Sequence, residues 1–397
     1  MKLLDFNHDF LSELQNIRRD IHAHPELGYE ETRTSALVAK MLTEWDIPVV
    51  RGMAGTGVVG IIRNGSSKRA IGLRADMDAL PMQELNKFAH TSRIPGKMHA
   101  CGHDGHTAML LGAAHYLSQH RSFDGTVYVI FQPAEESIGG AKRMIEDGLF
   151  QQCPMDAIFG MHNWPGPAFG KFGVRTGPMM ASSNTFTLNI KGLGSHAGQP
   201  NRGVDPIMAA IQIAQSWQTI ITRNKNPTEA AVLSITQIHA GSTFNVVPDN
   251  AVITGTVRTF STSTLDLVER RMREIAEHTA IAFDALAEFE FNRGYPPLIN
   301  DEQESSFAIE VMRSIAGENM VNEQMEPTMG AEDFAFYLQQ VPGCYVFLGN
   351  GKGEHRAVGH GNGPCNLHNP NYDFNDDLLP VGTTYWVRLA EEFLRRG

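Results

Sequence analysis

Residues 125–132 read GTVYVIFQ, a nearly continuous apolar run that leads directly into PAEE at 133–136. Such a run is typical of a strand that is buried on both faces, as strands in parallel sheets are. Residues 157–161 (AIFGM) form a second short run of the same character. Strand-like and helix-like segments alternate from about residue 55 to 165. This alternation predicts an α/β fold with a mainly parallel sheet flanked by helices.

Two local signals refine this region. Asn64-Gly65 is a turn signal that is typical of a β-hairpin, so we expect the flanking strands to pair. Asp104 stands where it could cap the helix that begins near residue 107. From apolar periodicity, the expected helices are 9–23, 31–45, 107–119 and 142–147, and the expected strands are 58–63 and 69–73.

The pattern changes near residue 182, where a strand with one polar face begins. The order of elements from there is β-α-β-β-α-β, which predicts an inserted ferredoxin-like α+β domain. After a linker, RGYPP at 293–297, the remaining segments are too few for a domain of their own and are expected to return to the first. We therefore expect one domain formed by 1–181 and 295–397, and an inserted domain, 182–294. Its expected elements are 184–190, 206–221, 231–239, 250–260, 264–286 and 288–292, and those of the return segment are 302–316, 345–348 and 381–396.

Length and composition limit the possible functions. A chain of 397 residues suggests two domains. The net charge of -11 argues against nucleic acid as a partner, because phosphate binding needs a basic face. The N-terminal residues have no apolar signal segment, and no run is long enough to cross a membrane. The four cysteines are scattered, so a reduced, cytoplasmic setting is expected.

The sequence KMHACGHDGH at 97–106 is rich in metal-binding side chains. A thiolate and an imidazole two residues apart, as at Cys101 and His103, are good ligands for a borderline-soft divalent metal. The alternative is a polar loop with solvated histidines. Because Cys101, His103 and His106 stand together before an apolar helix, we favour a metal site at this stretch.

Further polar groups follow predicted strands, where ligands of parallel sheets collect. Glu135 and Glu136 lie at the end of the 125–132 strand, and metal-dependent hydrolysis needs one carboxylate for the metal and one to take a proton from water. His162 follows the next buried strand. A lone histidine there would more often be structural, but in this series it is expected to bind metal. His368, far along the chain, could complete the site.

Asp76 and Asp78 have more than one interpretation. They lie two residues apart, so in an extended chain they share a face. Two such carboxylates bind a cation, pair with arginine or histidine, or cap a helix. Cys365 lies close to His368, but no second pair follows, so we expect it to be structural.

Taken in order, these motifs closely resemble the M20 metallopeptidase family. The branch that is most similar contains hippurate hydrolase, N-acyl-amino-acid hydrolases and plant auxin-conjugate hydrolases. The matching segments span residues 18 to 376 and are RRDIHAHPELGYEE, LRADMDALP, MHACGHDGHTAMLLGAA, VIFQPAEE, GMHNWP, GSHAGQPNRGVDPI, GSTFNVVPDNAVITGTVRT, MGAEDFAFYL and NLHNPNYDFND.

The resemblance implies a site with two divalent metal ions. It puts Glu135 at the general-base position, from which it would remove a proton from water activated by the metals. A thiolate ligand favours softer metals, so zinc, manganese, nickel and cobalt stay open. The implied metal ligands are Cys101, His103, Glu136, His162 and His368. This set leaves His99 and His106 as supporting residues.

One departure from the wider family concerns the strand end at 74–78. Many members have histidine at the position of Asp76 and aspartate at that of Cys101. Asp78 keeps its place and is expected to orient a metal ligand. Arg74 and Asp76 have no assigned role.

The inserted domain resembles the family's dimerisation domain, which implies a homodimer. By this resemblance, His196 reaches the partner's active site and donates to the oxyanion of the transition state. Asn245 and Arg258 fall on positions that bind the substrate carboxylate, although Arg258 could also be an ordinary surface arginine. Glu332 borders the pocket and has no assigned step.

The expected function is a metal-dependent amidohydrolase that cleaves N-acyl or N-aroyl amino acids, such as hippurate-like or N-acetyl compounds. A dipeptidase or aminopeptidase-type exopeptidase of the same fold is the alternative. A cysteine hydrolase with Cys101 as nucleophile would leave Glu136, His162 and His368 unexplained. A non-enzymatic metal-binding subunit would not need Glu135.

Overall fold

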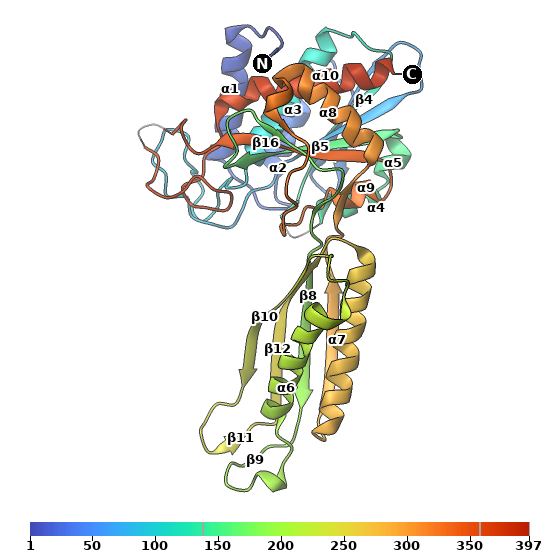
Figure 1. Cartoon of the computed structure of the whole chain (residues 1–397). Coiled ribbons are helices and arrows are strands. Elements are labelled where there is room, and N and C mark those ends of the chain that lie inside the picture. The colour runs from blue at the N-terminus through green and yellow to red at the C-terminus, as the bar shows by residue number, and fades with distance from the viewer. Residues whose placement is uncertain (137–138, 357–358, 397) are drawn as a thin grey trace. The chain divides into compact units, whose positions relative to one another are not determined.

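The computed structural model describes residues 1–136, 139–356 and 359–396. The chain folds into two compact units, coloured along the sequence in Figure 1. The first comprises Met1–Gly177, Ile299–Glu326 and Asp333–Gly397, and the second comprises Pro178–Leu298 and Pro327–Glu332. From the sequence we expected the divisions at 181/182 and 294/295, and we placed all of 327–332 with the first part.

The first unit contains an eight-stranded sheet in the order β1-β2-β4-β3-β5-β16-β6-β15. Its centre is parallel, since β4–β3, β3–β5 and β5–β16 are parallel pairs. Antiparallel pairs flank it at β1–β2, β2–β4 and β16–β6. The predicted mainly parallel sheet is confirmed. The strands are β1 (Val49–Met53), β2 (Gly57–Asn64), β3 (Ala70–Asp76), β4 (Gly125–Gln132), β5 (Ala157–Pro165), β6 (Phe172–Gly173), β15 (Val321–Asn322) and β16 (Gly343–Gly351).

Helices cover this sheet and complete its core. Side chains from α1, α2, α3, α8 and α10 join those of the strands in one hydrophobic cluster. α3 is buried along nearly its whole length, in keeping with its apolar sequence AMLLGAA. None of the helices in the described ranges is long and apolar enough to cross a membrane. The helices are α1 (His8–Ala23), α2 (Thr32–Glu44), α3 (His103–Gln119), α4 (Gly140–Glu146), α5 (Leu149–Gln152), α8 (Glu302–Ala316), α9 (Ala335–Leu338) and α10 (Leu379–Arg395), with 3-10 turns at Glu318–Met320 and Asp376–Leu378.

The hairpin expected at Asn64-Gly65 is wrong. β4 lies between β2 and β3 and pairs with both of them. The Asn64 amide instead donates to the backbone carbonyls of Arg121 and Phe123, at 2.9 and 2.6 Å. The turn is thus tied to the segment that enters β4. An Asn-Gly pair specifies a local turn, but it does not decide which strand becomes the neighbour.

The second unit is a four-stranded antiparallel sheet in the order β10-β12-β8-β13, with α6 and α7 packed on it. This is the order of a ferredoxin-like fold, as the sequence predicts. A small ribbon, β9 with β11, extends from it. Its elements are β8 (Asn184–Lys191), β9 (Ser195–His196), α6 (Pro206–Thr219), β10 (Ala231–Ala240), β11 (Val246–Val247), β12 (Asn250–Thr259), α7 (Thr262–Ala282) and β13 (Leu286–Arg293), with a 3-10 turn at Pro200–Arg202 and a π-helical turn at Ile220–Asn224; β7 (Gly177–Met180) and β14 (Leu298–Asn300) lie where the units meet in sequence.

Candidate metal centre

The sulfur, nitrogen and oxygen atoms of the expected metal ligands converge in the first unit. The Sγ atom of Cys101 lies 3.3 Å from Nε2 of His162. In the described part of the chain, five groups of potential ligands have atoms within 4.8 Å of one another, and three of them consist only of expected site residues. These three groups are Cys101 with His103 and His162, Cys101 with Glu136 and His368, and His103 with Glu135 and Glu136.

Four separate segments deliver these side chains to the carboxyl edge of the sheet. His103 is the first residue of α3, and His162 lies near the end of β5. Glu135 and Glu136 follow β4. His368 is exposed and has a positive φ of 59°, and its backbone N–H donates to the carbonyl of Ala100 at 2.8 Å. That bond holds the distant loop beside Cys101.

Asp78 contacts two of the expected ligands at once. Its Oδ1 lies 3.2 Å from Nδ1 of His103, and its Oδ2 accepts the backbone N–H of Glu136 at 2.9 Å. With the His103 Nδ1 proton directed at Asp78, Nε2 presents a lone pair. In the described part of the chain, this buried Nε2 has no hydrogen-bond partner. Its burial without a partner fits a metal ligand.

The acidic groups shape the charge of the site. Burial by itself lowers the pKa of His103, but Asp76 and Asp78 outweigh it and raise the pKa to about 10. Burial raises the pKa of the Cys101 thiol well above its usual value, and Glu136 and Glu135 raise it further. Both groups therefore favour their protonated forms in the ion-free site. A divalent cation must displace these protons, so its binding is coupled to pH.

His162 is held as a neutral imidazole. Its Nδ1 lies 2.6 Å from the carbonyl oxygen of Asn163, to which it donates, so Nε2 faces Cys101 as an acceptor. Burial lowers the pKa of His162 well below its usual value, and nearby His106 adds to this effect. A neutral imidazole with one free lone pair is the form that binds a metal.

His106 is occupied at both ring nitrogens. Its Nε2 accepts the backbone N–H of Asn163 at 2.9 Å, so its Nδ1 carries the proton. That proton points to Oδ1 of Asp76, 2.6 Å away. The contacts therefore give His106 a supporting role, as we expected from the sequence.

Arg74 and Asp76, which had no assigned role, form a buried ionic network. Arg74 donates from Nη1 to Asp76 at 2.6 Å, from Nη2 to Asp333 at 3.0 Å, and from Nε to Gln132 at 2.8 Å. Gln132 in turn donates to Asp333. Asp76 is thus paired with Arg74, and it also accepts the Nδ1 proton of His106. The i, i+2 spacing of Arg74 and Asp76 was the signal in the sequence for this pair.

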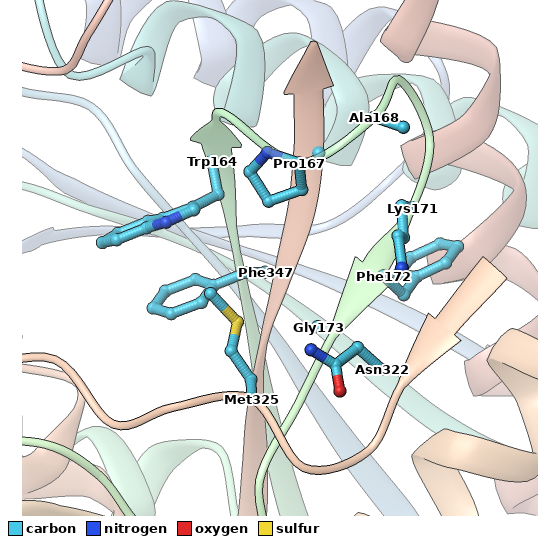
Figure 2. Close-up of a pocket in the computed structure, with 10 residues that line it drawn as sticks. Trp164, Pro167, Ala168, Lys171, Phe172, Gly173, Asn322, Met325 and Phe347 are labelled. Carbon is cyan, nitrogen blue, oxygen red and sulfur yellow. The ribbon is translucent and has the colours of Figure 1, made fainter. Parts of the chain in front are cut away.

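A cavity of about 260 Å³ adjoins the strand that carries His162 (Figure 2). Trp164, Phe172, Met325 and Phe347 are among the residues that line it. The rings of Trp164 and Phe347 stack with their centroids 4.1 Å apart. The ring of His162 meets the ring of Trp164 edge-on, at a centroid distance of 6.1 Å. The aromatic lining of the cavity therefore contacts one expected metal ligand, His162.

Asp104 does not cap α3, so that expectation is wrong. The helix begins at His103 after Gly102, and Asp104 lies inside its first turn. Its Oδ2 lies 2.9 Å from Nδ1 of His22 and 3.4 Å from Nη1 of Arg18. We expected the Asp104 carboxylate to accept backbone N–H groups of α3. It forms a long-range ion pair instead.

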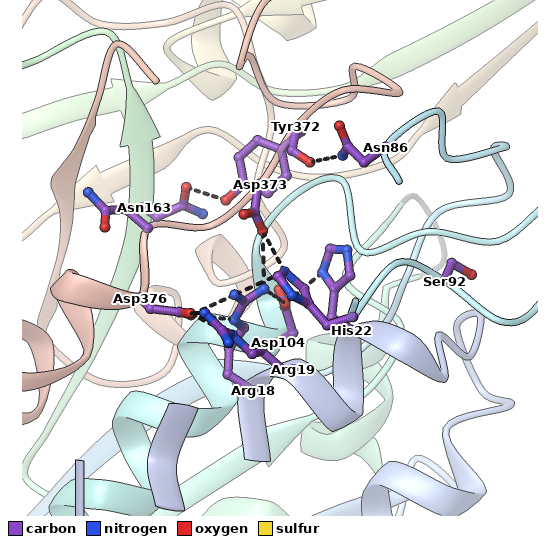
Figure 3. A network of polar contacts seen from close by, with 12 residues as sticks. Arg18, Arg19, His22, Asn86, Ser92, Asp104, Asn163, Tyr372, Asp373 and Asp376 are labelled. Atoms are coloured by element: carbon purple, nitrogen blue, oxygen red, sulfur yellow. Dashed lines mark hydrogen bonds and ion pairs between the residues drawn. The ribbon is translucent and has the colours of Figure 1, made fainter. Parts of the chain in front are cut away.

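Arg18 joins this ion pair to the C-terminal loop (Figure 3). Its guanidinium also contacts Asp373 at 3.2 Å and Asp376 at 2.6 Å. In the same loop, the Tyr372 hydroxyl donates to Oδ1 of Asn163 at 2.7 Å. The loop that carries His368 is therefore fastened both to α1 and to the end of β5. Sequence patterns missed this network because its members are far apart in the chain.

The remaining expected site residues lie in the second unit. His196 is on β9 and is paired with Val246 of β11, and the N–H of Ala197 donates to the carbonyl of Asn245 at 3.0 Å. His196 and Asn245 are both exposed on this ribbon. Arg258 lies near the far end of β12, half-buried. The structure groups His196 with Asn245 and leaves Arg258 apart.

Comparison with known proteins adds four similarities to this geometry. The family model of peptidase family M20/M25/M40 matches residues 72–392. The hippurate hydrolase of Campylobacter jejuni is 40% identical over 387 residues, 98% of this chain and 98% of that protein. An N-acetylcysteine deacetylase of Bacillus subtilis is 40% identical over 383 residues, 96% and 97% of the two chains. The solved structure of a dinuclear metal-binding M20 peptidase from Bacillus subtilis superposes with a TM-score of 0.85 at 37% identity, covering 98% and 99%.

Proposed function

The chain belongs to peptidase family M20/M25/M40, and from this premise we propose that it hydrolyses N-acyl and N-aroyl amino acids to a carboxylic acid and a free amino acid. It is a metal-dependent amidohydrolase. The names of its relatives, a hippurate hydrolase and an N-acetylcysteine deacetylase, support this class of substrate. The observation that carries the proposal is the convergence of sulfur, nitrogen and oxygen ligand atoms around the buried Nε2 of His103, beside Glu135. Among the described residues, this nitrogen has no hydrogen-bond partner and meets only Oδ2 of Asp76 in an ion-pair contact at 3.8 Å.

Five side chains would hold two divalent ions. When bound, the ions polarise the scissile carbonyl and lower the pKa of a water molecule. Asp78 keeps His103 in the tautomer that binds and fixes the backbone of Glu136. Glu135 lies within reach of this cluster, accepts the proton from water and later protonates the departing amine. The five side chains are Cys101, His103, Glu136, His162 and His368.

A cysteine hydrolase mechanism does not suit this site. A nucleophilic cysteine needs a lowered pKa, usually from neighbouring positive charge. Here burial, Glu136 and Glu135 raise the pKa of Cys101 well above its usual value. A role as metal ligand accounts for the same acidic surroundings. As a thiolate, Cys101 suits zinc, nickel or cobalt, and the carboxylates also suit manganese.

We propose that the enzyme works as a homodimer in which one site draws on both protomers. β12 begins at Asn250, next to the ribbon that carries His196 and Asn245. Arg258 lies near the other end of this strand. A strand rises about 3.3 Å per residue, so this separation is roughly 25 Å. One small substrate cannot span it within a single chain. The ribbon of one protomer and Arg258 of the other therefore serve the same site, with His196 as oxyanion donor and Asn245 and Arg258 binding the carboxylate.

A reducing compartment such as the cytoplasm suits this chemistry. All four cysteines are free, and Cys101 must keep its sulfur available for a metal. Oxidation of the Cys101 sulfur would remove the thiolate ligand from the metal site.

The proposal is tested by a hydrolysis screen on chelator-treated protein that is then reconstituted with zinc, manganese, nickel or cobalt. The substrates are acetyl-, benzoyl- and indolylacetyl-amino acids, with glycyl dipeptides measured under the same conditions. We expect hydrolysis of N-acyl amino acids that chelation abolishes and metal restores. Preference for dipeptides would point to the exopeptidase alternative, and full activity in metal-free protein would defeat the proposal.

A further inference from the structure

The cavity next to His162 has the character of a site for an aromatic group. Figure 2 shows Trp164, Phe347 and Met325 on one side of it and Phe172 on the other. Flat aromatic rings and a polarizable thioether favour stacked and edge contacts with another ring. The lining thus offers apolar contact, which is what small-molecule pockets commonly use for affinity.

Strand geometry places this cavity beside the metal ligands. His162 and Trp164 are two residues apart on β5, so their side chains lie on the same face of the sheet. Phe347 of β16 is the register partner of His162, so its side chain lies on that face as well. Trp164 and Phe347, which line the cavity, therefore lie on the same face of the sheet as the expected metal ligand His162.

The volume suits one aromatic group. A cavity of roughly 150 Å³ is enough to bind benzene in a protein core. The present cavity measures about 260 Å³, which leaves room for an indole or for a phenyl ring with a short linker. An acetyl group would leave most of it unfilled.

We propose that this cavity is the acyl pocket, and that it takes the aromatic ring of a benzoyl or arylacetyl group. This inference rests on the proposed function and narrows its substrate class to N-aroyl and N-arylacetyl amino acids. Lys171 is the one ionisable side chain among the ten lining residues. Its positive charge disfavours an acyl group that carries an ammonium, so the pocket selects uncharged rings over the free amino terminus of a dipeptide.

A filling variant tests the pocket. Ala168 is exposed at its rim, so Ala168→Trp puts an indole into the space with little effect on the core. Met325→Trp fills the cavity from another side and provides a second variant should the first fold poorly. Phe169→Ala is the matched control, because Phe169 is exposed in the same loop and does not line the cavity.

The measured quantity is the ratio of kcat/KM for benzoylglycine to that for acetylglycine. We expect both filling variants to lower this ratio by about tenfold or more, and the control to keep the wild-type ratio. Equal losses on both substrates, or no loss in either filling variant, would overturn the acyl-pocket assignment.

Benzoate binding, measured by calorimetry on the metal-loaded protein, separates this inference from the proposed function. If the wild-type protein cleaves no N-acyl amino acid, the proposed function fails. In that case benzoate binding that Ala168→Trp abolishes would still support an aryl site. Absence of benzoate binding to the wild type would overturn the site as well.

Discussion

At the scale of single residues, Asp78 does the most to shape the metal centre without being a proposed ligand. Its two oxygens contact Nδ1 of His103 and the backbone N–H of Glu136. Each carboxylate oxygen of Asp78 faces an N–H donor. If asparagine replaced Asp78, its NH₂ group would face one of these donors and could not accept its hydrogen bond. The resemblance to the M20 family implied this role, although not which residues Asp78 would contact.

We predict that Asp78→Asn lowers metal affinity by roughly 10- to 100-fold, the usual effect of losing a partner that orients a ligand. Metal titration with equilibrium dialysis measures it. Asp156→Asn is the control, because Asp156 also accepts a backbone N–H, from Ala70, at the start of β3. If both variants bind metal with equal affinity, Asp78 does not orient the metal ligands.

His22, in α1, is a buried histidine that contacts two carboxylates, Asp104 and Glu84. Burial alone would lower the pKa of His22, but Asp104 and Glu84 outweigh it and raise the pKa to about 10. Its proton is therefore held more tightly in the folded protein than in the unfolded chain, where the pKa is 6.5. The stabilisation is fully present below about pH 6.5 and is lost as pH rises through about 10.

We predict that His22→Gln is destabilised relative to wild type, and that the difference shrinks between pH 7 and pH 10. Urea unfolding of both proteins at several pH values gives the difference in free energy of unfolding. A difference that is constant over this range would show that His22 does not hold its proton as described.

At the scale of elements, the junction between the ligand loop and α3 leaves no room for a side chain at Gly102. Gly102 has a φ of +92°, and a Cβ atom there would overlap the side chains of Asn163 and Tyr372. Those side chains bond to each other and fasten the C-terminal loop to β5. Only glycine suits this position.

We predict that Gly102→Ala costs about 1 to 2 kcal/mol of stability from backbone strain and a further 1 to 3 kcal/mol from overlap, with weakened metal binding. Gly96→Ala is the matched control, since Gly96 has a φ of +76° and open space around it. Free energies of unfolding from urea titration should separate the two. Equal losses would mean that strain alone matters at Gly102.

Strong local patterns predicted most elements, and long-range partners decided the rest. The apolar run 125–132 became the buried strand β4, and the helix expected at 302–316 is α8. The Asn64-Gly65 hairpin and the Asp104 cap were wrong for one reason: each group found a partner far along the chain. The Arg74 network could not be predicted either, because Asp333 is brought to it only by the fold.

At the scale of the whole molecule, the metal centre is assembled from segments that are distant in the sequence. Cys101, Glu136 and His368 meet only because β4, α3 and the C-terminal loop share one edge of the sheet. The place of Glu136 after a predicted strand and the spacing of Cys101 and His103 pointed to this site, and the family resemblance added His368. The grouping of these side chains in space could thus be anticipated. Their hydrogen-bond partners could not.

We predict that two inactive variants restore activity when mixed. In a heterodimer of His196→Ala and Glu135→Gln chains, one of the two sites has an intact Glu135 and receives an intact His196 from its partner. After subunit exchange, random pairing gives about a quarter of the wild-type activity. A mixture that stays as inactive as its components would place His196 within its own chain's site or outside catalysis.

The most direct test of the central claim is a metal titration that records turnover and bound metal together. Chelator-treated protein is loaded stepwise, and hydrolysis of benzoylglycine is followed in the wild type and in Glu135→Gln. We predict that activity reaches its plateau as about two equivalents bind, and that the variant binds the same metal while its kcat falls by roughly 10²- to 10⁴-fold. Wild-type activity without bound metal, or unchanged turnover in Glu135→Gln, would contradict the account.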